Sequence, residues 1–339
     1  MPSTFPRLAL ALVTSCLLLA VFGCDADDNA SGTGAADGEK RLTIAVIPKS
    51  TGGEFWETVE QGARQAAEEL NVEMRWEGTL AETEIGEQNK IIENMANLGV
   101  DGLVLAPLNA RAMRKGVETT VASGIPVVIF DSAVEGDVQS SFVATDNRKG
   151  GQLAAEEMSK LLGGLDGKKL VVIRYLQGTA STEERADGFI ETAQAAGAAI
   201  AAEPYPEDGA VAGAKKTTAN TLESFVRDGR LEVDGIFAAN LYTTLGALAA
   251  LEDLRKGGIK VEAKFVGFDT SSKLIESLQA GEVQALIAQN PKKMGYLAVE
   301  TMVKHLRGEP VEPLIDTGVE VVTAERLSDP EVRKLVGLE

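Results

Sequence analysis

Residues Val100–Asp131, VDGLVLAPLNARAMRKGVETTVASGIPVVIFD, decide the fold class of this chain. They hold two short runs that are apolar throughout, Gly102–Ala106 and Pro126–Phe130, with a helix-like segment, Ala112–Ala122, between them. Strands that are apolar throughout and are separated by a helix of this length indicate a parallel sheet covered on both faces. We therefore expect a strand, a helix and a second, parallel strand in this segment.

The same alternation extends along most of the chain in both directions. Strands are predicted at 42–47, 72–76, 170–175, 198–202, 235–239, 264–268 and 285–288. Helices are predicted at 55–70, 85–98, 148–162, 183–196, 214–227, 244–255, 272–280 and 292–306. Strands and helices that alternate in this way indicate the α/β class, with doubly wound parallel sheets.

Two short motifs recur in the first and second halves of the chain. Val100–Gly102 and Val233–Gly235 both read VDG, and each opens a predicted strand. Ile129–Ser132 and Gly267–Thr270 both end a strand in Phe-Asp followed by a hydroxyl residue. In each half the two motifs lie one strand–helix–strand step apart. The repeat predicts two similar lobes.

The Phe-Asp motifs place one aspartate of each half, Asp131 and Asp269, after the carboxyl end of a predicted strand. Ligands of open α/β sheets bind outside the carboxyl ends of the strands. Either residue alone would be better explained as the cap of a following helix, because aspartate is a common N-cap. As a matched pair in two facing lobes, they are predicted to point into one shared cleft.

Length, charge and composition restrict the function. A chain of 339 residues has room for about two domains of ordinary size. The net charge of −18 argues against nucleic acid as a partner, because phosphate binding needs a basic face. A single histidine, His305, excludes a polyhistidine zinc site, and there is no phosphate loop or dinucleotide fingerprint. We therefore expect no metal, no cofactor and no enzymatic activity.

The N-terminus has the pattern of a secretory signal. One charged residue, Arg7, is followed by the apolar run Leu8–Phe22, which is shorter than the ~20 apolar residues that cross a membrane as a helix. Residues 1–23 are therefore expected to be a signal peptide. Residues 24–40 offer nothing to bury and are expected to form a flexible tether.

Residues Val21–Cys24, VFGC, resemble the lipobox of bacterial lipoproteins. The resemblance implies cleavage before Cys24, a lipid anchor on its thiol and export to the periplasmic face of a membrane. The only other cysteine, Cys16, lies inside the expected signal, so the mature chain would have no disulfide.

Further motifs resemble the ribose/allose type of periplasmic sugar-binding protein. They are TIAVIPK at 43–49, EFW at 54–56, ATDN at 144–147, residues 178–185, VGFD at 266–269 and IAQNP at 287–291, and the likeness continues in order from Arg41 to about Val322. It implies the type I periplasmic binding protein fold, in which two lobes are joined by a three-strand hinge. The expected lobes are 41–145 with 291–316, and 146–290 with 317–339.

The resemblance also implies a function and partners. Such a protein is the substrate-binding component of an ABC sugar importer, which captures a monosaccharide by hinge closure and delivers it to a membrane permease. We expect a monomer that binds a pentose, a hexose or a deoxysugar.

The family's sugar contacts can be carried over one position at a time. Phe55 and Trp56 lie where the family stacks aromatic rings on the sugar, and Lys49 matches the lysine of the allose-type members. The polar contacts fall on Asp131, Arg185, Asn240, Asp269 and Gln289. Aromatic rings suit the apolar faces of a sugar, and carboxylate, amide and guanidinium groups suit its hydroxyl edge. Because adjacent helix residues point in different directions, Trp56 rather than Phe55 is expected to face the cleft.

Two departures from the family bear on the choice of sugar. Ser132 replaces the arginine that follows the aspartate in ribose-binding members, and Glu207 falls near the position of a second-lobe aromatic residue. These differences put ribose itself in doubt and leave a hexose, a deoxysugar or another polyol open.

Other functions fit parts of the sequence. A glycosidase could use Asp131 and Asp269 as an acid–base pair, but carboxylates on opposite lobes suit capture better. A sensory binding protein for a sugar or a furanosyl signal would share the motifs and would dock on a chemoreceptor or a sensor kinase. A sugar-responsive repressor is disfavoured by the expected signal, by the acidic charge and by the lack of a helix-turn-helix ahead of Leu42.

Overall fold

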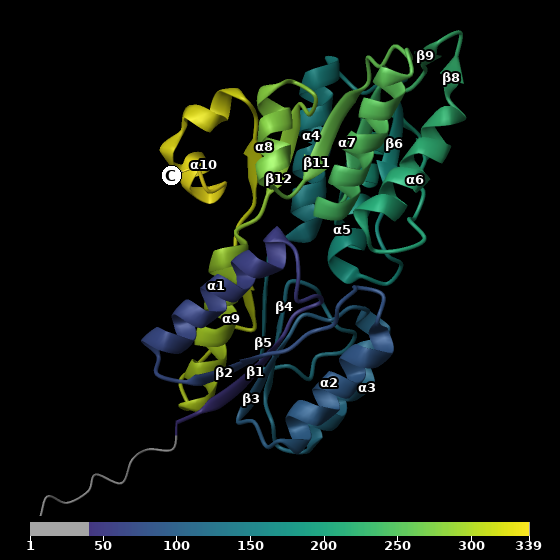
Figure 1. Ribbon diagram of the computed structural model, residues 1–339. Coiled ribbons are helices and arrows are strands. Elements are labelled where there is room, and N and C mark those ends of the chain that lie inside the picture. Colours follow the sequence, from purple (N-terminus) through teal and green to yellow (C-terminus); the bar gives the residue numbers. More distant parts are fainter. Residues whose placement is uncertain (1–40, 339) are drawn as a thin grey trace, which may run out of the picture. The chain divides into compact units, whose positions relative to one another are not determined.

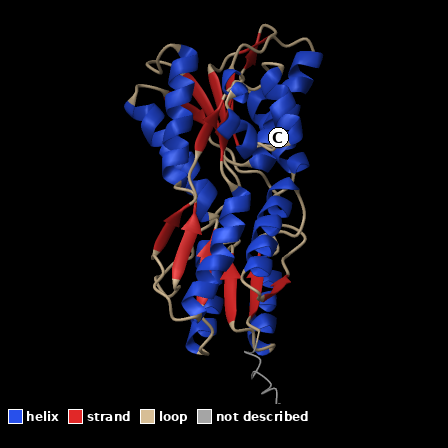
Figure 2. Ribbon diagram, turned by 90° about the vertical axis from the view of Figure 1, so that its left-hand side faces the viewer, coloured by secondary structure: helices blue, strands red, loops and turns tan. Residues whose placement is uncertain are grey.

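The computed structural model describes residues 41–338. These residues form two six-stranded sheets, each flanked by helices (Figures 1 and 2). The expected signal peptide, the expected tether and Cys24 lie outside the described residues. Within residues 41–338, no helix has the length and apolar character that crossing a membrane requires.

The two sheets have the same strand order. The first sheet runs β13 (Leu314–Asp316), β5 (Ser141–Ala144), β4 (Val127–Phe130), β3 (Gly102–Leu105), β1 (Thr43–Ile47), β2 (Glu73–Trp76). The second runs β14 (Glu320–Val322), β12 (Ala285–Ala288), β11 (Lys264–Phe268), β10 (Gly235–Ala238), β6 (Lys169–Ile173), β7 (Ala199–Ala202). The prediction of two similar parallel-sheet lobes is therefore confirmed.

Helices cover both faces of each sheet because the central strands are apolar on both sides. In the first lobe these helices are α1 (Glu54–Glu69), α9 (Pro291–Leu306), α2 (Ile85–Asn97) and α3 (Ala110–Ala122). In the second lobe they are α4 (Asn147–Leu162), α5 (Ala180–Ala195), α6 (Val211–Glu223), α7 (Leu241–Lys256) and α8 (Ser272–Gln279), with η1 (Glu325–Ser328) and α10 (Pro330–Leu335) packed on the same core.

The VDG repeat has the same structural role in both lobes. The carboxylate of Asp101 accepts a hydrogen bond from the amide of Thr43 at 2.8 Å, at the start of β1. The carboxylate of Asp234 accepts one from the amide of Lys169 at 2.8 Å, at the start of β6. Each aspartate thus fixes the entry of the neighbouring strand in its own lobe.

The chain passes between the two sheets three times. The connections are 145–146, from β5 to α4, then 289–290, from β12 to α9, and finally 317–319, from β13 to β14. The last connection leads directly from one sheet into the other. The strand β14 therefore runs away from the crossing and pairs antiparallel with β12, whereas the other pairs in the two sheets are parallel.

One predicted helix ends earlier than expected. Helix α6 stops at Glu223, and the next residues form a hairpin of β8 (Val226–Arg227) and β9 (Arg230–Leu231). Its turn is Asp228-Gly229, with positive φ at both positions, which is typical of a tight two-residue hairpin turn. This dipeptide was the signal that the sequence interpretation passed over.

Candidate functional site

A pocket lies between the carboxyl ends of the strands of the two lobes. It has about 350 Å³ of space not filled by atoms, part of it continuous with solvent. Its lining residues are Lys49, Phe55, Trp56, Glu82, Asp131, Tyr175, Thr179, Ser181, Thr182, Arg185, Asn240, Leu241, Tyr242, Asp269 and Gln289. All eight residues predicted as sugar contacts are among them.

The first lobe contributes a buried ion pair, Lys49 with Asp131. The ammonium Nζ of Lys49 lies 2.6 Å from Oδ2 of Asp131, and both residues are buried. The same ammonium group donates to the hydroxyl of Ser181 in the second lobe at 3.3 Å. Asp131 precedes strand β5 rather than a helix, so it is not the helix cap that remained an alternative.

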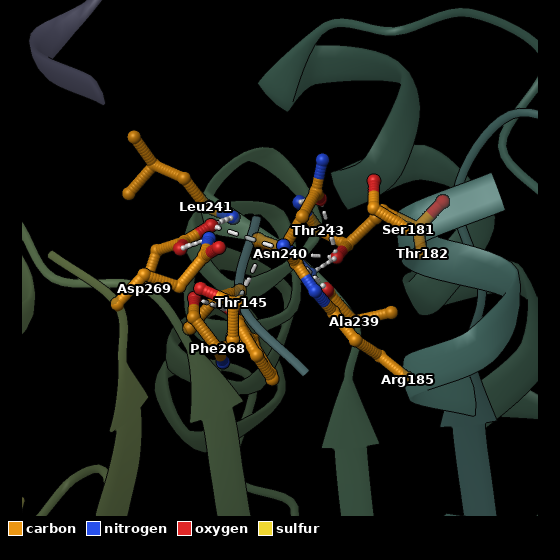
Figure 3. Close-up of polar contacts among 12 residues, drawn as sticks. Thr145, Ser181, Thr182, Arg185, Ala239, Asn240, Leu241, Thr243, Phe268 and Asp269 are labelled. Carbon is orange, nitrogen blue, oxygen red and sulfur yellow. Dashed lines mark hydrogen bonds and ion pairs between the residues drawn. The ribbon is translucent and has the colours of Figure 1, made fainter. Parts of the chain in front are cut away.

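The second lobe contributes a network around Asp269. Its Oδ2 accepts from the amide of Leu241 at 2.8 Å and lies 3.9 Å from Nη1 of Arg185, while its Oδ1 accepts from Nε2 of Gln289 at 2.6 Å (Figure 3). Burial raises the pKa of Asp269, and Arg185 opposes that rise. The cap of the following helix is Ser271, so Asp269 too is not a helix cap.

Two polar side chains beside this network offer groups to a ligand. Asn240 caps α7: its Oδ1 accepts from the amide and the hydroxyl of Thr243 at 3.0 and 2.8 Å, which leaves Nδ2 to donate. Nε2 of Gln289 donates to Asp269, and Oε1 of Gln289 is buried without a hydrogen-bond partner. An unpaired buried acceptor is costly unless a ligand pairs with it.

Arg185 is fixed before any ligand arrives. Its Nε donates to Oδ1 of Asn147 at 2.8 Å, and its Nη1 donates to the carbonyl of Ala239 at 3.2 Å. The guanidinium carbon lies 4.0 Å from the ring centroid of Phe268. Burial lowers its pKa, while Asp269 raises it. The planar guanidinium group of Arg185 is therefore held in place with one edge toward the pocket.

Both aromatic residues of the first helix line the pocket, Phe55 as well as Trp56, which was the one expected to face the cleft. The two rings lie 5.0 Å apart with their planes at 90°. They occupy the first turn of α1, and helix side chains tilt toward the N-terminus, so both reach past the end of the helix. Trp56 is 2% exposed and packs edge-on against Phe130, whereas Phe55 is half-buried.

The sequence interpretation missed three large pocket residues. Tyr175 and Tyr242 stack with ring centroids 6.1 Å apart, and Tyr175 donates to the carbonyl of Gly209 at 3.1 Å. Glu82 accepts from Nε1 of Trp56 at 2.8 Å. The missed hydroxyl residues Thr179, Ser181 and Thr182 lie inside the 178–185 motif. Glu207, by contrast, is exposed, pairs with Lys216 and is not part of the lining.

Hydrogen bonds join the two lobes beside the pocket. The hydroxyl of Thr179 donates to the carbonyl of Leu108 at 3.0 Å, and the amide of Ala110 donates to the carbonyl of Gly178 at 3.0 Å. The amide of Ser181 donates to the hydroxyl of Ser132 at 3.0 Å. Ser132, one of the two departures from the family noted in the sequence, therefore serves as a contact between the lobes.

The part of the chain that the structure describes contains no cluster of three or more metal-ligating side chains. His305 lies on α9, and its Nε2 is 3.2 Å from the hydroxyl of Ser140. It is not among the residues that line the pocket.

Comparison with known proteins gives consistent likenesses over both lobes. The periplasmic binding protein domain model matches residues 44–310. The D-ribose/D-allose-binding protein of Pseudomonas aeruginosa is 29% identical over 301 residues, which are 85% of this chain and 91% of that protein. An ABC transporter solute binding protein from Agrobacterium vitis with bound D-fucose is 32% identical, with a TM-score of 0.80 over 87% of this chain and 99% of that one. A carbohydrate transporter solute binding protein from Agrobacterium radiobacter in complex with D-arabinose is 28% identical, with a TM-score of 0.81 over 88% and 99%.

Proposed function

Because this chain belongs to the periplasmic binding protein family and is of its ribose/allose type, we propose that it captures a monosaccharide between its two lobes. In this proposal it is the substrate-binding component of an ABC sugar importer and hands the sugar to a permease. The solved relatives of known ligand are named as transporter solute binding proteins and hold neutral sugars.

The observation that carries the proposal is the chemistry of the pocket lining. Aromatic rings come from both lobes: Phe55 and Trp56 from the first, and Tyr175 and Tyr242 from the second. Fixed donors and acceptors lie among them, including the unpaired Oε1 of Gln289. Apolar ring faces bounded by polar groups are what recognition of a sugar requires, because a sugar has apolar C–H faces and a polar rim.

We propose that capture proceeds by hinge closure. The moving parts would be residues 41–145 with 291–316 and residues 146–290 with 317–339, which turn about the three connections between the sheets. The hydrogen bonds of Leu108, Ala110 and Ser132 to the second lobe would form as the cleft closes.

A thermal-shift screen of the chain from residue 38 onward tests the binding function. The panel is D-ribose, D-allose, D-arabinose and D-fucose. One sugar is expected to raise the melting temperature in the manner of RT ln(1 + [L]/Kd). Asp269→Asn should remove the shift, whereas Asp253→Asn, an exposed aspartate of the same lobe, should keep it. Absence of a shift with every sugar, from protein shown by mass spectrometry to carry no bound ligand, would contradict the proposal.

The importer role has its own test. Deletion of the gene should abolish uptake of the radiolabelled sugar that the screen identifies, and restoring the gene should restore uptake. Normal uptake together with lost chemotaxis or lost induction by that sugar would instead establish the sensory role.

We also propose that Cys24 anchors the protein to the membrane through a lipid, on the strength of the VFGC motif. Cys24→Ser should move the protein from the membrane fraction to the soluble fraction, and globomycin should block processing of the unaltered chain. Processing that globomycin does not block would contradict the proposed lipid anchor.

Binding without catalysis is part of the same proposal. Asp131 faces Lys49, and Asp269 is held by Arg185, Leu241 and Gln289, so neither carboxylate is arranged as one half of an acid–base pair. We expect no release of p-nitrophenol from a panel of p-nitrophenyl glycosides. Release that disappears in Asp269→Asn would contradict this part.

A further inference from the structure

Glu82 is a pocket residue held by a well-ordered loop. It lies on the loop 77–84 between β2 and α2. The hydroxyl of Thr79 donates to the carbonyls of Lys49 and Ala81, at 2.6 and 2.9 Å, and the carboxylate of Glu84 accepts from the amide of Leu80 at 3.0 Å. The loop is thus fixed from both sides, and Glu82 is placed in the pocket wall rather than left at the surface.

The charges of the pocket do not balance if Glu82 is ionised. The lining contains three carboxyl groups and two cations. Lys49 lies 2.6 Å from Asp131, and Arg185 lies 3.9 Å from Asp269, so each cation already has its own carboxylate. The groups that hydrogen-bond to Glu82 are neutral: they are Nε1 of Trp56, at 2.8 Å, and the hydroxyl of Tyr175.

Glu82 is half-buried in the pocket wall, and a carboxylate that is shielded from water without a cation of its own tends to take up a proton. Burial raises the pKa of Glu82 above its usual value. The charge of Asp131 raises it further, whereas the charge of Lys49 and the hydrogen bonds from Trp56 and Tyr175 lower it. The second lobe presents Tyr175 and Tyr242, whose own pKa values are raised by burial. Arg185 lines the same pocket and is paired with Asp269, and the charge of Glu82 is among those that raise the pKa of Arg185.

We propose that Glu82 is a specificity-determining residue whose protonated carboxyl group donates a hydrogen bond to an oxygen of a neutral sugar. One carboxyl oxygen accepts from Trp56, and the other carries the proton that the ligand receives. With Glu82 neutral, the pocket contains two cations and two carboxylates, a balance that a neutral sugar preserves. Sugar acids and sugar phosphates are disfavoured, because the pocket has no unpaired cation for them. This inference rests on the sugar-binding function proposed above.

Calorimetric titration across a pH range tests the inference. The four sugars of the panel are titrated into the unaltered protein and into Glu82→Gln, Glu82→Ala and Glu77→Gln, from about pH 5 to about pH 9. Glutamine keeps the shape of the protonated acid, with an acceptor for Trp56 and a permanent donor for the ligand. Glu77 is an exposed acid of the same loop and provides the matched control.

The required proton fixes the sign of the pH effect. The affinity of the unaltered protein should fall as pH rises, approaching tenfold per pH unit above the pKa of Glu82. Glu82→Gln should bind sugar within about threefold of the affinity that the unaltered protein has at low pH. Its affinity should not depend on pH in the way that the affinity of the unaltered protein does, because the amide donor of glutamine does not titrate. Glu82→Ala should be weaker at every pH, and Glu77→Gln should follow the unaltered protein.

Opposite results overturn the inference and leave the proposed function intact. These are an affinity that rises with pH, a Glu82→Gln variant that is as weak as Glu82→Ala, or a pH dependence that Glu82→Gln retains in full. If Glu82 makes D-glucosamine bind more tightly than D-glucose, the carboxyl group of Glu82 is ionised, and the inference is likewise overturned. If none of the sugars binds the unaltered protein at any pH, both the inference and the proposed function fail.

Discussion

Asp131 and Asp269 share an uncommon backbone conformation, with φ of 61° and 69°. Aspartate tolerates this left-handed region better than most residues. The amide of each still donates to the next strand, to Val143 at 3.0 Å and to Ile287 at 2.8 Å. In each lobe the backbone therefore turns only after the strand has ended, and the carboxylate points away from the sheet toward the pocket. The repeated Phe-Asp motif was a sound basis for predicting this pair, because the same turn occurs in both lobes.

Removing Asp131 should be costly because it leaves the ammonium of Lys49 buried without a partner. We expect Asp131→Ala to lower the free energy of unfolding by about 3–5 kcal/mol. Replacing both members, Asp131→Ala with Lys49→Met, should recover most of that loss. Urea unfolding of the two single variants and the double variant gives the coupling energy. A double variant as unstable as the sum of the singles would show that the pair does not interact.

Two of the pocket residues that the sequence interpretation missed, Tyr175 and Glu82, lack a local signal. Tyr175 was taken as the last residue of a strand, yet β6 ends at Ile173 and the tyrosine turns into the pocket. Glu82 lies in a loop with no periodicity, and its role depends on Trp56, which is 26 residues away in sequence. Contacts of this kind arise only when the elements have packed, so composition and spacing could not reveal them.

At the scale of elements, the central strands were predictable because they are apolar throughout. Strands β1, β3, β4, β10, β11 and β12 have the bounds expected to within one residue. Strand β5 and the edge strands β13 and β14 were missed: β13 and β14 have only three residues each, and β13 is exposed or half-buried along its whole length. Edge strands need less apolar surface, and their pairing is decided by tertiary contact rather than by local pattern.

Close packing of helices positions the guanidinium of Arg185. Helix α4 contacts α5 at Gly151, where an added Cβ would lie 2.0 Å from the carbonyl oxygen of Arg185. Gly151→Ala should therefore displace α5, lower the free energy of unfolding by about 1–3 kcal/mol and weaken sugar binding.

A second glycine gives the control for that variant. Gly86 lies in the first turn of α2 with no atom within 4 Å of an added Cβ. Gly86→Ala should be neutral to stabilising, by up to about 1 kcal/mol, and should leave affinity unchanged. Chemical denaturation and calorimetry of the two variants check both expectations. Equal stability of Gly151→Ala and the unaltered protein would show that α5 is free to shift.

At the scale of the whole molecule, a glycine lies where the second lobe contacts the first. Gly178 has a φ of +82°, and an added Cβ would lie 2.2 Å from Nδ2 of Asn109 in the first lobe. Gly178→Ala should therefore hinder closure, weaken sugar binding at least tenfold and leave the protein more extended with ligand. Small-angle scattering with saturating sugar measures the extension.

The control for this variant must share its backbone strain. Gly167, in the same lobe, has a φ of +67° with no atom within 4 Å of an added Cβ. Gly167→Ala should lose stability to a similar degree yet close normally. If the two variants close and bind alike, Gly178 has no part in closure.

The arrangement of the lobes was predictable in outline, because the repeated motifs indicate two similar halves and the family resemblance implies a hinge. The antiparallel pairing of β14 with β12 could not be predicted. It follows from the last connection, 317–319, which carries the chain directly from the first sheet into the second and so reverses its direction relative to β12. The spacing of residues contains no information about that reversal.

The placement of the two buried ion pairs has a consequence for the surroundings in which the protein can work. Lys49 and Asp131 both belong to the first lobe, and Arg185 and Asp269 both belong to the second. Among residues 41–338, no ion pair joins one lobe to the other. Opening the cleft therefore separates two surfaces that are each neutral at these pairs, and dissolved ions have little attraction to screen.

The balance between open and closed forms should accordingly be insensitive to ionic strength. Scattering profiles and sugar affinity at about 0.05 M and about 0.5 M sodium chloride should agree within about twofold, although the screening length differs severalfold between them. A large fall in affinity with salt would show that charges attract across the cleft. If the cleft binds a neutral sugar as proposed, we expect the protein to capture that sugar equally well in dilute and in saline water.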